Sequence, residues 1–372
     1  MNSKLSTSMK VKFDNIKRAW MITDIHLGVR NSSNEWQEIQ RDYFFNFFIP
    51  LVKKEYKPGD VLLVLGDVFD SRNAINLKVL CLGIDIFEAL SKIFTDGILI
   101  ILGNHDVWAK NTNDINSVRA LKWIPNIHIY EEPASLQIGS KKFFAMPWRK
   151  DHEAEKECIQ AMGPGNDYML CHTDIQGFRF NKTTEIEEGC AIDEFKQFEK
   201  VFSGHIHYSQ RVKNIHMLGS PYQLTRSDIG NPKGVTVLDI NTGTETYFEN
   251  DHSPKFIKMK FSDILEMSPS RLNSIFKSNF VDIYLDGEQS LNAPISTFMD
   301  LLDGKYIRMD FHPILDGKDD VIEDLEVDAN FDLLKFVKDY VDSLSYNEEK
   351  KEKMYNFISK LYKTTEQQEY QI

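Results

Sequence analysis

Cysteine is scarce in this chain of 372 residues. The cysteines are widely separated and form no paired motif, which excludes a disulfide framework and a structural zinc finger. They are Cys81, Cys158, Cys171 and Cys190. A protein without disulfides suits a reducing compartment, so we expect the cytoplasm.

Long apolar runs are also missing. The longest clean runs, residues 61–65 and 98–102, are far shorter than the roughly 20 apolar residues of a membrane-spanning helix. Residues 1–17 are polar and lack the apolar stretch of a signal peptide. We therefore expect no membrane partner.

Basic residues are in the minority, 44 Lys and Arg against 56 Asp and Glu, and the formal net charge is −12. This acidity argues against a protein that coats nucleic acid through its overall charge. It is compatible with an enzyme that meets phosphate locally, because bound metal ions can supply the positive charge. A hydrophobic fraction of 42% and the length favour two or three folded domains.

The first part of the chain alternates between buried strands and an amphipathic helix. Short apolar runs at residues 19–23, 61–65 and 98–102 predict strands. Between the last two, apolar residues spaced by three and four over residues 76–94 predict a helix, and hence a parallel strand–helix–strand unit. The predicted apolar face of this helix consists of Leu77, Leu80, Cys81, Ile84, Phe87 and Leu90.

Shorter apolar runs separated by turn residues continue to residue 249. They predict further strands at residues 127–130, 143–146, 168–171, 200–203, 215–218, 235–240 and 246–249. We therefore expect an α/β fold, a two-sheet sandwich flanked by helices, over residues 18–254. Residues 1–17 would form a polar N-terminal extension.

The composition changes near residue 255. Residues 280–286, 293–302 and 306–311 predict a strand, a helix and a strand, a small α/β cap domain within residues 255–315. An acidic linker is expected over residues 316–329, where charge predicts a solvated segment.

Residues 330–372 are expected to form a C-terminal helix pair. Apolar residues gather on one side of each of two predicted helices, residues 331–344 and 348–362. Such a pair can cover the main domain or dock on a partner, and the sequence favours neither.

Half of the histidines, and one acidic cluster, follow predicted strands directly. The motifs are Asp24-Ile25-His26, Gly66-Asp67-Val68-Phe69-Asp70, Gly103-Asn104-His105-Asp106, Cys171-His172 and Gly204-His205-Ile206-His207. Each alone is commonly an ordinary turn at a strand end. Together they lie where α/β sheets place their ligand sites, so we expect one metal centre.

The residue types indicate which metals would bind. Residues two apart in an extended segment point to the same side, so Asp24 and His26 can grip one ion, as can His205 and His207. The carboxylate of Asp67 can bridge two cations. Imidazole with carboxylate and amide oxygen suits Mn²⁺, Fe²⁺ or Zn²⁺, whereas Ca²⁺ prefers oxygen ligands alone.

The ordered set of motifs over residues 24–207 resembles the calcineurin-like metallophosphoesterase superfamily, with its series Asp-x-His, Gly-Asp, Gly-Asn-His, His and Gly-His-x-His. Asp106 replaces the Glu of protein phosphatases, and the second motif lacks their Arg-Gly. The turn Gly219-Ser220-Pro221, followed by Leu224, resembles SbcD-type nuclease subunits of DNA repair complexes. The phage members of that group, recombination endonuclease subunits of T-even-like viruses, are the most similar.

The resemblance implies a role for each residue. Asp24, His26, Asp67 and His207 would hold one divalent ion, and Asp67, Asn104, His172 and His205 a second. His105 would be the catalytic residue that stabilises or protonates the transition state, with Asp106 orienting its ring. The two ions, Mn²⁺ by preference of the family, would support hydrolysis of DNA phosphodiester bonds.

The resemblance also implies partners. These are DNA and an SbcC-type ABC ATPase bound through the helix pair, with a homodimer inside a heterotetramer in the host cytoplasm if the protein is phage-encoded. Residues 36–48 are a candidate dimer surface, and core packing explains their aromatic residues equally well. Four cations near the last motif could meet a phosphate backbone or be ordinary solvated charges: Arg211, Lys213, Arg226 and Lys233.

Two other functions remain open at this point. A hydrolase on the same fold could act on a phosphoprotein, a cyclic nucleotide or a nucleotide-lipid. A scaffold with this fold would have no activity, but such proteins usually lose ligand residues and none is missing here.

Overall fold

The computed structural model describes residues 12–13, 15–109, 112–285 and 308–313, with positions 338, 351, 352 and 355. The chain divides into two units between Val321 and Ile322, inside the segment expected as an acidic linker. That linker, the cap helix expected at residues 293–302 and almost all of the C-terminal helix pair lie outside the described residues. The domain boundaries beyond residue 313 therefore stay predictions.

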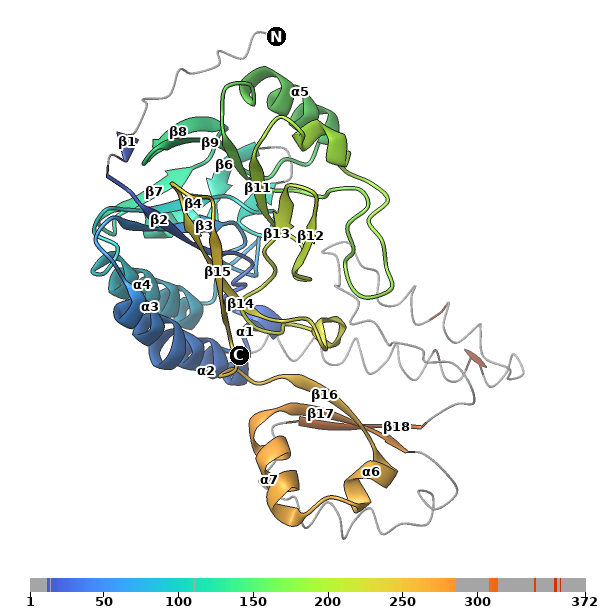
Figure 1. Ribbon diagram of the computed structural model, residues 1–372. Helices are drawn as coiled ribbons and strands as arrows, with labels where there is room; N and C mark the ends of the chain where they lie inside the picture. The colour runs from blue at the N-terminus through green and yellow to red at the C-terminus, as the bar shows by residue number, and fades with distance from the viewer. Residues whose placement is uncertain are drawn as a thin grey trace. The chain divides into compact units, whose positions relative to one another are not determined.

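One half of the sandwich is a six-stranded sheet (Figure 1). In spatial order its strands are β15 (Glu245–Glu249), β14 (Gly234–Asp239), β2 (Arg18–Ile22), β3 (Asp60–Leu65), β4 (Ile98–Ile101) and β7 (Ile127–Tyr130). The four strands from β2 to β7 are parallel, and β14 runs antiparallel to both of its neighbours. All six were predicted, and their observed ends differ from the expected ones by a residue or so.

The other half is a seven-stranded sheet. In spatial order its strands are β1 (Lys12–Phe13), β8 (Ala134–Ile138), β9 (Lys141–Met146), β10 (Tyr168–His172), β11 (Lys200–Gly204), β13 (Ile215–Met217) and β12 (Gln210–Val212). Strands β9, β10, β11 and β13 are parallel. Because β1 pairs with β8 and the side chains of Phe13 and Ile16 are buried, these residues belong to the domain and not to a separate polar extension.

The two sheets pack face to face, and alternate residues of each strand enter different cores. In β2, Ala19 and Met21 contact the second sheet, whereas Trp20 and Ile22 face the helices. Both faces of the six-stranded sheet are therefore covered, which explains why its central strands are continuously apolar. The α/β sandwich expected from the sequence is confirmed.

Helices cover the outer faces of the sheets (Figure 1). The longer helical elements among the described residues of the sandwich divide between its sheets, four on the six-stranded sheet and one on the seven-stranded sheet. The four are α2 (Asn34–Asp42), the π-helical turn η1 (Tyr43–Phe48), α3 (Ile49–Glu55) and α4 (Leu77–Ser91), and the last is α5 (His152–Met162). Trp36, Tyr43, Phe44 and Phe48 are buried in this layer, so core packing accounts for most of the aromatic residues considered as a dimer surface.

The buried face of α4 agrees only in part with the predicted one, since Phe87 and Leu90 are buried as expected. Leu77 is 73% exposed and Cys81 is exposed, whereas Val79, Leu82 and Ile86 are buried. The helix is apolar almost all round, so residue spacing fits two faces equally well. The close approach at Gly83 selects the observed face, because a Cβ there would lie 2.9 Å from the Phe69 ring. The side of α4 that carries Gly83 therefore faces the sheet.

The cap forms its own small sheet after the sandwich. It comprises β16 (Phe256–Lys260), α6 (Phe261–Leu265), α7 (Pro269–Ser278), β17 (Phe280–Leu285) and β18 (Arg308–Pro313), with three parallel strands in that order. The ring of Phe280 stacks on Trp36 of α2 at 5.6 Å between centroids. Within the described part of the chain, no helix is both long and apolar enough to cross a membrane.

Candidate metal centre

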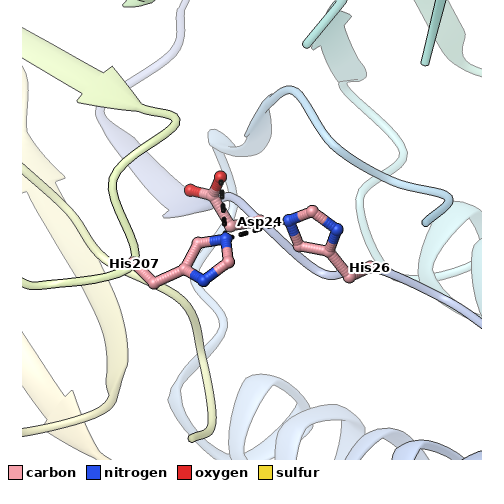
Figure 2. Close-up of side chains that lie close together, drawn as sticks. All are labelled: Asp24, His26 and His207. Atoms are coloured by element: carbon pink, nitrogen blue, oxygen red, sulfur yellow. Dashed lines mark hydrogen bonds and ion pairs between the residues drawn. The ribbon is translucent and has the colours of Figure 1, made fainter. Parts of the chain in front are cut away.

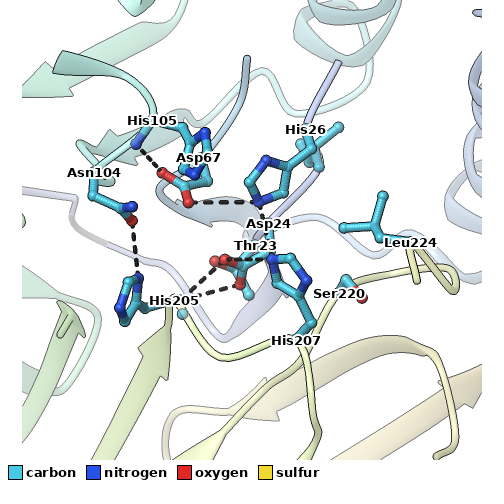
Figure 3. Close-up of polar contacts among 12 residues, drawn as sticks. Thr23, Asp24, His26, Asp67, Asn104, His105, His205, His207, Ser220 and Leu224 are labelled. Carbon is cyan, nitrogen blue, oxygen red and sulfur yellow. Dashed lines mark hydrogen bonds and ion pairs between the residues drawn. The ribbon is translucent and has the colours of Figure 1, made fainter. Parts of the chain in front are cut away.

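The carboxyl ends of five strands, three from the six-stranded sheet and two from the seven-stranded sheet, bring the predicted site residues together; Figure 3 labels all of them except His172. Loops after β2, β3, β4 and β11, and the last residue of β10, supply them. These residues are Asp24, His26, Asp67, Asn104, His105, His172, His205 and His207. The carboxyl ends of parallel strands are where α/β sheets place their ligand sites.

The backbone at the site is held in a conformation that most residues avoid. Asp24, His26, Asp67 and His205 all have left-handed backbone, with φ between 48° and 82°. Such a conformation costs about 1–3 kcal/mol for each residue and persists where the surrounding structure enforces it, commonly at functional sites. Gly66 also has positive φ, and a Cβ there would meet the imidazole of His172 and the backbone of Gly103.

The first donor cluster consists of Asp24, His26 and His207, whose ligand atoms lie within 4.8 Å of one another (Figure 2). Nε2 of His207 lies 3.0 Å from Nε2 of His26 and 4.0 Å from Oδ1 of Asp24. Two loops far apart in the sequence, one after β2 and one after β11, thus bring three donors to one point.

The second donor cluster consists of Asp67, His172 and His205, and Asn104 joins it. The Asn104 Oδ1 lies 2.9 Å from both His172 Nε2 and His205 Nδ1. Asp67 Oδ2 lies 3.3 Å from His172 Nε2 and 3.5 Å from His26 Nε2. Asp67 therefore sits between the two clusters, where one carboxylate can reach two ions.

The spacing and the outer contacts of these donors fit divalent ions. Metal–ligand bonds of about 2.1 Å place neighbouring donors about 3.0–3.4 Å apart, close to the separations observed. The second ring nitrogen of His26 contacts Asp70 Oδ1, that of His172 the Leu65 carbonyl, and that of His205 Asp174 Oδ1. Metal-binding histidines are characteristically oriented by such contacts. The arrangement is that of a divalent metal site.

The buried charges shift the pKa values strongly. Burial opposes protonation of His26, but Asp70 and Asp67 outweigh it and raise the pKa of His26 to about 10. In the same way Asp67 overcomes the effect of burial and raises the pKa of His172 to about 9. These histidines in turn hold the pKa of Asp67 well below its ordinary value, against the effect of its own burial.

His207 and His105 shift in the opposite direction. Burial, with the positive charge of His26, holds the pKa of His207 well below its ordinary value. Burial also lowers the pKa of His105, although Asp67 opposes this shift. In the metal-free protein near neutral pH, His26 and His172 therefore carry protons, and His207 and His105 are neutral.

The structure corrects the role expected for Asp106. The Asp106 carboxylate accepts hydrogen bonds from the backbone N–H groups of Asp67, Val68 and Gly103, at 2.8–3.0 Å. Its oxygens are directed at the two strand-end turns, and the His105 ring is held instead by the Asp70 carbonyl, 2.7 Å from Nδ1. Asp106 thus fixes the loops that carry the donors.

Several side chains that support the site were not predicted. Gln40 of α2 is fully buried and donates to the carbonyl of His26, while its own oxygen accepts from the N–H of Gly28. The Tyr222 hydroxyl donates to the Ile25 carbonyl, next to the metal-site loop. Spacing could have suggested Asp174, two residues after His172, but nothing local to Gln40 or Tyr222 indicates these contacts.

The four cations considered for DNA contact are all ion-paired. Lys233 is buried and bonds Asp228 and the His207 carbonyl, and Arg226 pairs with Asp282 of the cap. Arg211 pairs with Glu245, and the exposed Lys213 with Asp193. The idea that Lys233 and Arg226 meet a phosphate backbone is therefore wrong, because both support the fold.

A two-sheet α/β sandwich with a paired Asp/His metal site at its strand ends defines a metallophosphoesterase. The model of the calcineurin-like phosphoesterase family matches residues 17–209, more than half of the chain, and the chain belongs to this family. The family membership expected from the motifs is confirmed.

One protein of known assignment is similar over most of its length. Exonuclease subunit 1 of Enterobacteria phage T4 is 27% identical over 257 residues, which cover 66% of this chain and 73% of the phage protein. Among solved structures, an archaeal phosphodiesterase matches 63% of this chain and 99% of its own, at 13% identity and a TM-score of 0.33. A protein of unknown function from Aquifex aeolicus matches 49% and 93%, at 17% identity and a TM-score of 0.28.

Proposed function

We propose that this protein is a DNA nuclease, a two-metal phosphodiesterase that works as one subunit of an ATPase–nuclease complex. The observation that carries the proposal is the position of Asp67 between two clusters of metal donors. Two ions that share a carboxylate can act together on one phosphodiester. Membership of the phosphoesterase family and the similarity to a phage exonuclease subunit support it.

In this proposal each cluster holds one ion. Asp24, His26, Asp67 and His207 bind the first, and Asp67, Asn104, His172 and His205 bind the second. The donors are nitrogen and oxygen in equal measure, which suits Mn²⁺, Fe²⁺ or Zn²⁺, and we propose Mn²⁺. The measured separations and the oriented imidazoles support this assignment.

The residues of the chain have distinct tasks in hydrolysis. When bound, the two ions supply activation of a water molecule and stabilise charge on the phosphate oxygens. His105 is placed by the Asp70 carbonyl at Nδ1, which leaves Nε2 for the substrate. Burial lowers the pKa of His105 and keeps its imidazole neutral near neutral pH, so His105 must first take up a proton at Nε2 before it can donate one to the leaving oxygen.

Exposed side chains near the site support nucleic acid as the substrate. The strand β5 (Val107–Ala109) begins directly after the motif that carries His105, and it pairs with β6 (Thr112–Asn116) in a hairpin. Trp108 on β5 is 55% exposed, and Ile115 on β6 is 57% exposed. Exposed aromatic rings are platforms on which single-stranded bases stack.

The partners proposed are DNA and an SbcC-type ATPase. The similar phage protein is named as a subunit, which supports a partner. We assign ATPase binding to the helix pair of residues 330–372 and propose a homodimer inside the complex. Phe45 and Phe47, half-buried on the π-helical turn, are the aromatic residues of that segment left for a dimer contact.

A cleavage assay tests the proposal. End-labelled linear double-stranded DNA and single-stranded circles are incubated with Mn²⁺, with Mg²⁺ or with a chelator, and the ATPase subunit is added in parallel. The proposal predicts cleavage that needs Mn²⁺ and is lost with the chelator. Hydrolysis of a small phosphodiester without any cleavage of DNA, even with the ATPase, would retain the metal site and indicate a different phosphoester substrate.

Substitution of Trp108 tests the contact with DNA separately. Loss of a stacked base costs about 1–3 kcal/mol, so Trp108→Ala should weaken single-stranded DNA binding about 5- to 150-fold. Hydrolysis of a small phosphodiester should not change. Trp123→Ala is the matched control, because Trp123 is 88% exposed but precedes β7 at its amino end, the opposite edge of the sheet. Equal DNA affinity in both variants would contradict the assignment of Trp108.

A further inference from the structure

Arg72 differs from the cations considered above for DNA contact. Arg211, Arg226 and Lys233 each have a carboxylate partner. Arg72 forms no ion pair with any described residue, and its Nε is buried without a hydrogen-bond partner. Its Nη2 lies 2.8 Å from the side-chain amide of Asn104. A partly buried guanidinium without a counter-charge is costly unless an anion joins it.

The Asn104 amide can satisfy Arg72 or a metal ion, but not both. With Oδ1 toward His172 and His205, the amide nitrogen faces Arg72 Nη2, and two donors oppose each other. The reverse orientation gives the oxygen to Arg72 and turns the nitrogen toward the two histidines. Only an oxygen can be a metal ligand, so an Asn104 that binds metal leaves Arg72 without an acceptor.

Arg72 also lies within reach of the reaction centre. It follows Asp70, whose carboxylate contacts His26 and whose carbonyl holds the His105 ring. Its charge acts on the His105 imidazole. The segment from Asp67 to Arg72 therefore joins the bridging carboxylate, the support of His105 and one unpaired guanidinium.

We propose that Arg72 binds a non-bridging oxygen of the substrate phosphodiester. This inference rests on the proposed function. A guanidinium presents its N–H donors in a fork that matches the geometry of phosphate oxygens. When Asn104 Oδ1 binds a metal ion it can no longer accept from Arg72, and the oxygens of a bound phosphate would take its place as acceptors. Arg72 is thus a substrate-binding residue, and neither metal needs it as a ligand.

The test measures phosphate binding apart from catalysis. Inorganic phosphate is titrated into Mn²⁺-loaded wild-type protein, Arg72→Gln and Arg72→Lys by calorimetry, after Mn²⁺ stoichiometry and affinity are measured for each. Charge-assisted hydrogen bonds to phosphate predict a loss of affinity of about 10- to 100-fold in Arg72→Gln. Both ions should remain bound. Arg72→Lys should recover part of the affinity, because it restores the charge without the fork.

Arg41→Gln is the matched control, since Arg41 is an exposed arginine on α2 that pairs with Asp85, and its phosphate affinity should equal that of wild type. Equal phosphate affinity in Arg72→Gln and wild type would overturn the inference. A loss of Mn²⁺ affinity in Arg72→Gln with unchanged phosphate affinity would also overturn the inference, because it would show that Arg72 only orients Asn104. Failure of the proposed function gives a different result, because it appears in the wild-type protein: no hydrolysis of any phosphodiester if the metal site is inactive, or hydrolysis of a small phosphodiester without DNA cleavage if the substrate is not DNA.

Discussion

Nε2 of His207 faces Nε2 of His26 across 3.0 Å, with the two rings inclined at 72°. One nitrogen must carry a proton and the other must accept it. The proton belongs to His26, because Asp70 and Asp67 raise its pKa while burial lowers that of His207. A metal ion bound by this cluster would take the place of the proton, and His26 and His207 would then both be ligands.

Metal binding is therefore expected to release protons. The pKa values of His26 and His172 are about 10 and about 9, so both side chains are protonated at pH 7. An imidazole that binds a metal ion must be neutral. Mn²⁺ affinity should rise with pH by up to about tenfold per unit for each proton displaced, until the pH passes these values. Calorimetry at pH 7 in buffers of different ionisation enthalpy measures the protons released. Zero release would contradict the account.

Removal of Asp67 should cost both ions. Its carboxylate lies within 3.5 Å of ligand nitrogens from each cluster, so Asp67→Ala takes a donor from both. We expect the two-ion titration of wild type to disappear in a calorimetric measurement. Asp193→Ala is the control, because this exposed residue pairs with Lys213 away from the site. Full occupancy in Asp67→Ala would show that this carboxylate does not bridge.

The ion pair beneath His207 should matter for stability. Lys233 is 5% exposed and bonds both Asp228 and the His207 carbonyl. Asp228→Ala leaves a buried charge unpaired, and we expect a loss of about 3–5 kcal/mol in the free energy of unfolding. Urea denaturation measures it. The exposed ion pair between Lys213 and Asp193 gives the comparison, since Lys213→Ala should lower the free energy of unfolding by at most about 1 kcal/mol. Similar losses in the two variants would be inconsistent with a buried pair.

Deletion of residues 330–372 should separate catalysis from assembly. We expect the shortened protein to hydrolyse a small phosphodiester at the wild-type rate, because the whole donor set lies before residue 208. It should no longer co-purify with the ATPase. Co-purification that survives the deletion would remove the helix pair from the interface.

The sequence predicted the strands and donors because both depend on local pattern. Continuous apolar runs marked β2, β3 and β4, and each was followed at once by the Asp, Asn or His that the structure brings to the site. The order of the strand-end motifs was sufficient to predict that these donors meet, since the carboxyl ends of parallel strands lie at the same edge of a sheet. The separate strand β8 and helix α5 were not predicted, because their short or mixed apolar patterns are weak signals.

The sequence could not determine contacts between distant segments. The face of α4 depends on how closely Gly83 approaches Phe69, and the partner of Arg226 lies in another sheet. Asp106 sits beside His105 in sequence, but its carboxylate turns toward backbone donors of a different loop. The motif therefore placed Asp106 correctly at the site, but its position next to His105 led to a wrong prediction of which group its carboxylate contacts.

The central claim is that two ions and His105 hydrolyse a phosphodiester. The most direct measurement is Mn²⁺-dependent hydrolysis of bis(p-nitrophenyl) phosphate by wild type and His105→Ala, with the bound Mn²⁺ counted in each. The account predicts two ions per chain in both proteins and activity in the wild type alone. Equal activity in the two proteins, or loss of metal from His105→Ala, would contradict the separation of His105 from the ligands.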